Sequence, residues 1–250
     1  MFKKVGIVGI SGRLGLEISN FITIQNKYQL GLSYTRSENK NVPISEVFLQ
    51  NDYVIDCSSP ENILNVLLAA TKNPKPLIVL TTGWDENSIQ QELHLLSKLT
   101  PIIIAPNTSL GAYVQSVVVR DIAKILDSEY DIDIVEQHHR KKLDQPSGTA
   151  LNLFGAITKS KKQNQQLDYE LYEAKNEIRN PHTISITSRR SGNIPGEHEV
   201  CFTSNDEIIS VKHIALNRAL FAKGALKIIN WLDNEKPQPG IYHLSDIFKY

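Results

Sequence analysis

The chain contains few of the residues that mark several large protein classes. Only two cysteines, Cys57 and Cys201, occur among its 250 residues, and they lie far apart in the sequence. Such a pair indicates neither a disulfide framework nor a zinc motif, so both are expected to be buried, unreactive thiols. Basic and acidic residues balance at 27 each. This balance supplies no bulk charge to attract nucleic acid or an anionic membrane, and small molecules are therefore the expected ligands.

Long apolar segments are also missing. No run approaches the roughly 20 apolar residues that span a bilayer. Lys3 and Lys4 precede apolar residues, but Arg13 and Glu17 interrupt them before the core and cleavage site of a signal peptide could form. We therefore expect a cytoplasmic protein, long enough for one large domain or two modest ones.

The first half of the chain alternates strand-like and helix-like segments. Hydrophobic patterns predict strands at 5–8, 29–34, 53–56, 77–81 and 101–104, and helices at 16–22, 61–71, 86–98 and 110–126. Alternation of this kind predicts an α/β fold, a Rossmann-like parallel sheet with helices on both faces.

The pattern changes after residue 130. Strands are predicted at 131–137, 182–188, 199–203 and 207–212, and their alternation favours a mixed or antiparallel sheet in a second, α+β domain. The polar run at 159–166 is typical of a solvated loop. A final amphipathic helix at 217–232 is expected to pack back on the first domain.

The segment Gly9-Ile10-Ser11-Gly12-Arg13-Leu14-Gly15 places glycines three residues apart between a strand and a helix. Glycine permits a tight turn and lets the backbone approach a pyrophosphate, which the helix N-terminus stabilises. Tight turns also use glycine for purely steric reasons. The preceding strand and the βα alternation favour the nucleotide interpretation.

The end of the second strand indicates which dinucleotide is bound. An acid there would bind the adenosine ribose hydroxyls, but the chain has Thr35 and Arg36, with no acid before Glu38. Because Arg36 can pair with a 2′-phosphate, NADPH is the preferred cofactor, with NADH as a second one.

Two further turns follow predicted strands at the carboxyl edge of the sheet, where open α/β sheets bind ligands. They are ordinary strand-to-helix connections or contacts to the nicotinamide half of the cofactor, and the second interpretation is favoured. The residues concerned are Leu80, Thr81 and Thr82 in one turn and Ala105, Pro106, Asn107 and Thr108 in the other.

The most informative segment is 136–150, E-Q-H-H-R-K-K-L-D-Q-P-S-G-T-A. On a strand, Glu136 and His138 share one face, and the following loop lets Lys142 return beside the imidazole. A helix then begins, with Ser147 or Thr149 as its N-cap. Such a segment is polar surface or an anionic-substrate site with a proton donor. No metal is expected, because adjacent strand positions cannot both face one ion and no third ligand lies at useful spacing.

Together these segments resemble the dihydrodipicolinate reductase family. The segment 136–150 is similar to the family signature E-x-H-H-x-x-K-x-D-x-P-S-G-T-A at every fixed position. Further similarities are the 9–15 glycine segment, T-T-G-W at 81–84, N-x-S-x-G at 107–111, and R-x-G at 190–192 followed by P-G-E-H at 195–198.

The resemblance implies NAD(P)H-dependent reduction of the cyclic imine formed from 4-hydroxy-tetrahydrodipicolinate, giving tetrahydrodipicolinate, in lysine and diaminopimelate biosynthesis. It implies that His138 donates and accepts a proton and that Lys142 is a second donor. It further implies that His139 and the backbone of Gly148 and Thr149 hold a substrate carboxylate. Leu80 and Thr108 depart from residues common in the family.

The family architecture implies a dinucleotide-binding domain at 1–108 and 217–250, with a substrate-binding and oligomerisation domain at 109–216 between the two segments. It also implies a homotetramer. Two alternatives remain: another NAD(P)-dependent imine or amino-dicarboxylate oxidoreductase, or a non-catalytic nucleotide sensor on the same fold.

Overall fold

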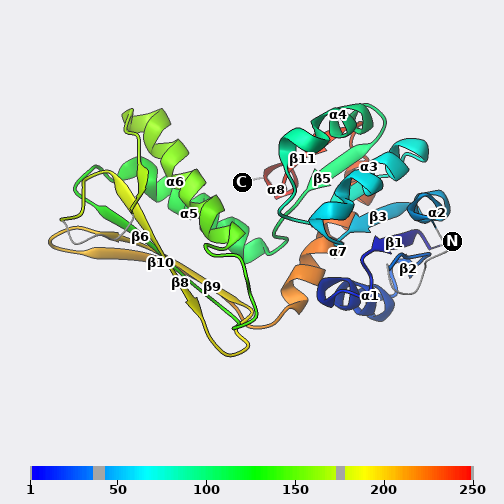
Figure 1. Cartoon of the computed structure of the whole chain (residues 1–250), viewed down its shortest axis with the longest axis horizontal. Helices are drawn as coiled ribbons and strands as arrows, with labels where there is room; N and C mark the ends of the chain where they lie inside the picture. Colours follow the sequence, from blue (N-terminus) through cyan, green and yellow to red (C-terminus); the bar gives the residue numbers. More distant parts are fainter. Residues whose placement is uncertain (1, 36–42, 173–177, 249–250) are drawn as a thin grey trace. The chain divides into compact units, whose positions relative to one another are not determined.

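The computed structural model describes residues 2–35, 43–172 and 178–248 and divides into two compact units (Figure 1). The first unit comprises Met1–Ser109 and Arg218–Tyr250, and the second comprises Leu110–Asn217. Across the described ranges, no helix is both long enough and apolar enough to cross a lipid bilayer.

The first unit is built on a six-stranded parallel sheet with the strand order β11-β5-β4-β3-β1-β2. Helices α1 and α7 pack over one hydrophobic core, and α2, α3 and α4 over another. The predicted Rossmann-like arrangement is therefore confirmed. The strands are β1 (Lys4–Val8), β2 (Gln29–Leu30), β3 (Tyr53–Asp56), β4 (Leu77–Val79), β5 (Pro101–Ile104) and β11 (Gly240–Tyr242). The helices are α1 (Arg13–Gln25), α2 (Ile44–Gln50), α3 (Ile63–Lys72), α4 (Glu86–Ser97), α7 (Ala219–Glu235) and α8 (Leu244–Ile247), and a 3-10 turn spans Pro60–Asn62.

The second unit has a mixed five-stranded sheet with the order β10-β9-β6-β8-β7. Strand β6 pairs in parallel with β8 and antiparallel with β9. Helices α5 and α6 share one hydrophobic core with the sheet. The mixed sheet predicted for this part of the chain is confirmed. The elements are α5 (Leu110–Ile125), β6 (Asp131–His138), α6 (Gly148–Gln165), β7 (Glu170–Tyr172), β8 (Thr183–Arg190), β9 (Gly196–Thr203) and β10 (Ile208–Ala215).

The prediction of a solvated loop at 159–166 was wrong, because α6 continues to Gln165. Lys161 in this run is fully buried. Its Nζ donates to the carbonyl oxygens of Leu126 and Asp127, at 2.6 and 3.1 Å, just after α5 ends. A lysine that satisfies carbonyls beyond a helix end is stabilised by the helix dipole, while its hydrocarbon stem packs in the core.

Helix α7 packs tightly against the turn after β5. The Thr108 hydroxyl donates to the Phe221 carbonyl at 2.7 Å. A Cβ atom added at Gly224 would lie 1.8 Å from the Thr108 carbonyl oxygen. Only glycine therefore fits at this contact.

We expect Gly224→Ala to destabilise the protein by about 3 kcal/mol, because the added methyl group forces α7 away from the turn. Gly155→Ala is the matched control, since Gly155 is also helical and a Cβ there meets nothing within 4 Å. That control should stabilise the protein by about 0.5–1 kcal/mol through helix propensity. Urea unfolding followed by circular dichroism measures both. Equal effects of the two substitutions would contradict the packing argument.

Candidate functional site

The first unit contains the glycine turn predicted to bind phosphate. It connects β1 to α1, and Gly9 has a φ of +92°. A Cβ at Gly9 would lie 2.7 Å from the Cys57 carbonyl oxygen, and one at Gly15 would lie 2.4 Å from the Gly9 oxygen. Gly9 thus permits the turn, and Gly15 permits close packing of the helix on it.

Helix α1 begins immediately after this turn. Gly12 is its N-cap and makes no side-chain cap hydrogen bond, so the first-turn N–H groups are not capped by the side chain at that position. A helix N-terminus with uncapped N–H groups favours an anion. The turn therefore fits the pyrophosphate of a dinucleotide.

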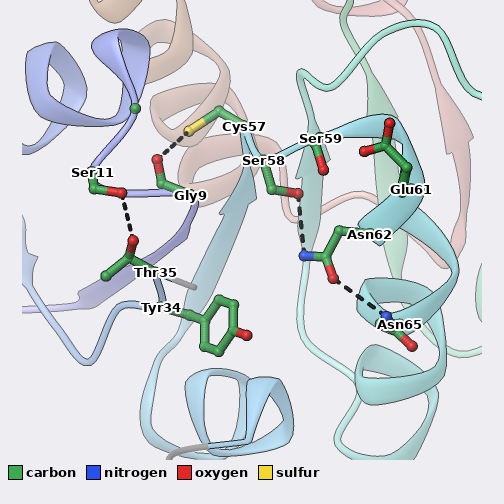
Figure 2. A pocket seen from close by; sticks show the side chains of 11 residues that line it. Gly9, Ser11, Tyr34, Thr35, Cys57, Ser58, Ser59, Glu61, Asn62 and Asn65 are labelled. Carbon is green, nitrogen blue, oxygen red and sulfur yellow. Dashed lines mark hydrogen bonds between the residues drawn. The ribbon is translucent and has the colours of Figure 1, made fainter. Parts of the chain in front are cut away.

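A cavity of about 420 Å³ adjoins the glycine turn (Figure 2). Its walls come from the glycine turn, the segment after β2, and the segment from the end of β3 into α3. The lining residues are Gly9, Ser11, Gly12, Tyr34, Thr35, Cys57, Ser58, Ser59, Glu61, Asn62 and Asn65.

Hydrogen bonds stabilise the walls of this cavity. The Ser11 and Thr35 hydroxyls join the glycine turn to the segment after β2, and within the β3–α3 wall Asn62 Nδ2 donates to Ser58 Oγ at 3.4 Å (Figure 2). Burial raises the pKa of the half-buried Cys57 thiol to about 12. Cys57 is therefore a neutral wall residue rather than a nucleophile, although it is less buried than predicted.

Asp56, the last residue of β3, connects two loops at the carboxyl edge of the sheet. Its fully buried carboxylate accepts hydrogen bonds from Ser58 Oγ and Thr81 Oγ1, both at 2.6 Å. Burial raises the pKa of this carboxyl group, and the hydrogen bonds from Ser58 and Thr81 oppose that rise. The sequence pattern predicted Asp56 only as the end of a strand. The available indication of its role was that it is a single acidic residue directly after three apolar ones.

The predicted cofactor residues fall into three groups. Gly9, Ser11 and Gly12 line the cavity, and Ile10, Arg13 and Leu14 belong to the same turn or the start of α1. The turns after β4 and β5 lie at the same edge of the sheet but do not line this cavity, with Leu80, Thr81, Ala105 and Thr108 buried and Thr82 and Pro106 exposed. Asn107 is half-buried and accepts a hydrogen bond from the Ser109 backbone at 2.9 Å. Arg36 lies outside the described residues.

Sequence reasoning missed the wall formed by the β3–α3 segment. All its lining residues except Asn65, which lies in α3, belong to the run D-C-S-S-P-E-N, which begins at the end of β3. The available signal was positional, because this segment leaves the carboxyl edge of the sheet as the other site loops do.

In the second unit, β6 ends in a buried acid and a buried histidine. The Glu136 and His138 side chains lie on the same face of the strand, as predicted, and His138 Nδ1 hydrogen-bonds to Glu136 Oε2. His139, one residue on, is half-buried. The carboxylate and the imidazole therefore form a buried hydrogen-bonded pair.

Arg190, the last residue of β8, holds the same carboxylate with both arms of its guanidinium group. Its Nη2 lies 2.8 Å from Glu136 Oε1, and its Nη1 lies 3.0 Å from Oε2. Burial alone would raise the pKa of Glu136. The hydrogen bonds from Arg190 and His138 outweigh burial and lower that pKa to about 2, so Glu136 is ionised at neutral pH.

His198 on β9 packs edge-on against His138, with ring centroids 5.0 Å apart. Burial and the neighbouring His138 lower the pKa of His198 to about 3. The pKa of His138 is also lowered, first by burial and then by the charges of Lys142 and Arg190, and the hydrogen bond and charge of Glu136 oppose this. Both rings are therefore largely neutral at pH 7 in the free protein.

The loop after β6 carries Lys142 and leads into α6. Lys142 Nζ lies 2.8 Å from Asp144 Oδ1. Ser147 is the N-cap of α6 and accepts from the Ala150 backbone at 3.2 Å, so Ser147 rather than Thr149 occupies that position. Ser147 also hydrogen-bonds to His198 Nε2 at 3.0 Å. His138 is thereby linked through His198 to the start of α6.

The N-terminus of α6, where Gly148 and Thr149 are predicted to contact a carboxylate, has space for a ligand at Gly148. Gly148 is exposed, and a Cβ there would meet nothing within 4 Å. Thr149 follows it in the first turn of α6. An imidazole, an ammonium group and a helix N-terminus together favour an anionic substrate that takes up a proton.

One cluster bears on metal binding. Glu136, His138 and His198 each offer a ligand atom, and these atoms lie within 4.8 Å of one another. The sequence argument that no third ligand lies at useful spacing overlooked His198, which β9 brings here from a distant part of the sequence. Arg190 already engages both Glu136 oxygens, and its positive charge opposes a cation at this place.

Comparisons with known proteins agree with these observations. Residues 3–108 match the family model described as "Dihydrodipicolinate reductase, N-terminus", and residues 111–248 match the one described as "Dihydrodipicolinate reductase, C-terminus". The chain is 40% identical over 240 residues to the 4-hydroxy-tetrahydrodipicolinate reductase of Chlamydia abortus, covering 96% of both chains. It is 35% identical to the enzyme of the same name from Campylobacter jejuni subsp. doylei, covering 98% of this chain and 96% of the relative.

A solved structure shares the fold. The dipicolinate-bound dihydrodipicolinate reductase of Paenisporosarcina sp. TG-14 aligns with a TM-score of 0.71 and 20% identity, covering 97% of this chain and 98% of that one.

Proposed function

Because this chain belongs to the dihydrodipicolinate reductase family, we propose that it reduces the cyclic imine derived from 4-hydroxy-tetrahydrodipicolinate to tetrahydrodipicolinate. The chain is a nicotinamide-dependent oxidoreductase of lysine and diaminopimelate biosynthesis. The observation that carries the proposal for the site is the buried Glu136–His138 pair beside Lys142 and the start of α6. These groups suit a ring dicarboxylate that gains a proton.

The residues of the second unit have separate roles in this proposal. His138 exchanges a proton with the substrate, and Lys142 is a second proton donor. His139, with the backbone N–H groups of Gly148 and Thr149, holds a substrate carboxylate. Overall, one hydride and one proton are added to the substrate. A positive, hydrogen-bonding pocket stabilises the electron density that hydride addition places on the ring.

The cofactor residues lie in the first unit. The glycine turn and the N-terminus of α1 hold the pyrophosphate, and the adjoining cavity accommodates the adenosine half. The turns Leu80–Thr82 and Ala105–Thr108 contact the nicotinamide half. When bound, the reduced nicotinamide supplies the hydride. The first unit is then the dinucleotide-binding domain and the second the substrate-binding and oligomerisation domain.

The decisive assay mixes the purified chain with NADPH and enzymatically generated substrate and follows the absorbance of the reduced nicotinamide. Oxidation that depends on this substrate supports the proposal. Oxidation only with a different imino or amino dicarboxylate would indicate another oxidoreductase. Nucleotide binding without turnover on any of these compounds would indicate a sensor. The homotetramer and the cytoplasmic location remain proposals, to be tested by light scattering and cell fractionation.

We expect NADPH to be preferred over NADH. The segment after β2 presents Thr35 rather than an acid to the cavity, and Arg36 follows it as a partner for the 2′-phosphate. Arg36→Ala should lower kcat/KM for NADPH by about tenfold or more and change the value for NADH little, as expected for the loss of one charge-assisted contact. Arg120→Ala, at an exposed arginine of the second unit, is the control.

The cavity wall provides a competing test of this preference. Glu61 lines the cavity, and a ribose hydroxyl bound to its carboxylate would favour NADH instead. A preference for NADH that Arg36→Ala leaves unchanged and Glu61→Gln abolishes would overturn the NADPH proposal.

A further inference from the structure

The R-x-G and P-G-E-H motifs at 190–198 have no role in the proposed chemistry, yet they surround His138. The Ser191 backbone donates to the His138 carbonyl at 2.8 Å, and the Arg140 backbone donates to the Gly192 carbonyl at 3.2 Å. A Cβ at Gly196 would lie 3.1 Å from His138 Nε2. The turn between β8 and β9 therefore holds the backbone at His138 and Arg140, and the start of β9 packs against the imidazole.

Arg190 makes contacts in two directions. One side of the guanidinium group holds both oxygens of Glu136, whose carboxylate receives His138 Nδ1. Its Nη2 also donates to the Asp144 carbonyl at 2.7 Å. The Asp144 carboxylate in turn pairs with Lys142. A single guanidinium group thus reaches both residues to which proton transfer is assigned.

We infer that Glu136 and Arg190 are positioning residues that set the orientation and tautomer of His138, and that Arg190 at the same time anchors the loop that carries Lys142. The inference rests on the proposed function. An ionised Glu136 accepts a hydrogen from Nδ1, which leaves Nε2 as the nitrogen that exchanges the proton with substrate. Arg190 prevents Glu136 from turning away, because both carboxylate oxygens are engaged.

The charges around His138 predict a signature that a purely structural role would not produce. Four groups face the ring: Glu136 from β6, Arg190 from β8, His198 from β9 and Lys142 from the loop. Removing the negative charge with Glu136→Gln should lower the pKa of His138. Removing the positive charge with Arg190→Gln should raise it. Each shift should be about one pH unit, the lower end of the range for charges in contact.

The test titrates the His138 ring by NMR in the full-length protein, which requires no activity. The ring nitrogens of wild type should report the Nδ1–H tautomer at neutral pH. With cofactor and substrate, both variants should lower kcat at least tenfold, and the pH profiles should move in opposite directions. The dissociation constants of NADPH and of the probe dipicolinate should stay within about twofold. Glu199→Gln, an acid on β9 that accepts from the Ser210 hydroxyl, is the matched control and should change none of these values.

Three results would overturn the inference: shifts of the His138 pKa in the same direction in both variants, a wild-type His138 ring in the Nε2–H tautomer, or weaker dipicolinate binding with an unaltered kcat. The last would make Arg190 a substrate ligand.

If Glu136→Gln does not fold, Arg190→Gln and Arg190→Lys carry the test. Arg190→Lys keeps the charge but loses the two-armed contact, so it should lower kcat without moving the pKa. If the wild-type protein does not turn over the substrate, but the two variants still shift the His138 pKa as expected, the proposed function is refuted and the positioning of His138 is not.

Discussion

Replacing His138 with glutamine is expected to lower kcat by about 10²–10⁴-fold, the contribution that a positioned general acid makes. Glutamine can still hydrogen-bond to Glu136, but it cannot exchange a proton near neutral pH. Because His138 belongs to the second unit and the glycine turn to the first, the dissociation constant of NADPH should remain close to that of wild type. Steady-state kinetics and a fluorescence titration of the reduced cofactor measure the two quantities.

Lys142→Ala should also lower kcat strongly, because on the proposed function it removes a second proton donor and a positive charge from the substrate site. Lys141→Ala is the matched control, since Lys141 is the exposed neighbour in the same loop. It should leave kcat near the wild-type value. If the His138 and Lys142 substitutions instead weakened cofactor binding and left kcat intact, these residues would belong to the cofactor site.

The second large effect concerns stability in acid. His198 is buried, and its pKa is lowered to about 3 from an ordinary value of 6.5. Below pH 6.5 the unfolded chain therefore binds a proton at this residue that the folded chain does not. Above pH 6.5 the neutral His198 therefore costs the folded protein no stability. As the pH falls from 6.5 toward the pKa of His198 in the folded protein, the free energy of unfolding decreases by about 1.4 kcal/mol per pH unit.

Urea unfolding of wild type and His198→Gln between pH 7.5 and 4 tests this effect. Glutamine cannot titrate but can still accept the Ser147 hydrogen bond, so the variant should lose less stability per pH unit than wild type. His94→Gln, on the exposed face of α4, should follow the wild-type curve. Parallel curves for wild type and His198→Gln would show that His198 is not held neutral. His138 and His213, whose pKa values are also lowered, add to the slope in both proteins, so the difference between the two curves measures His198 together with its coupling to these neighbours.

Much of the fold could be predicted from hydrophobic pattern. Strands β3 and β5 occupy the predicted residues, because their side chains are buried on both faces and their apolar runs are continuous. The short elements β7, β11 and α8 were not predicted. Strand β11 has three residues and depends on pairing with β5, which no local pattern reveals. The loop prediction at 159–166 was wrong for a related reason. The burial of Lys161 depends on carbonyl groups just after the end of α5, which the local sequence does not reveal.

In the candidate site, too, some residues could be predicted from local pattern and others could not. Glu136 and His138 could be paired from strand periodicity alone, since residues two apart share a face. Arg190 and His198 could not, because β8 and β9 bring them to β6 only through the sheet register, in which His138 lies opposite Arg190 and Glu136 opposite His198. Local spacing therefore paired Glu136 with His138, whereas Arg190 and His198 reach this pair only through long-range strand pairing.

The contact between Thr108 and α7 bears on how this architecture can change. The polypeptide leaves the first unit after Ser109 and re-enters it at Arg218, and the Thr108–Phe221 hydrogen bond joins the two crossing points inside that unit. The intervening 110–217 stretch is therefore an insertion into the first unit, and the two points where the chain leaves and re-enters that unit are already joined by this hydrogen bond. Exchanging such an insertion for another need not disturb the packing of the first unit, which on the proposed function is the unit that binds the coenzyme.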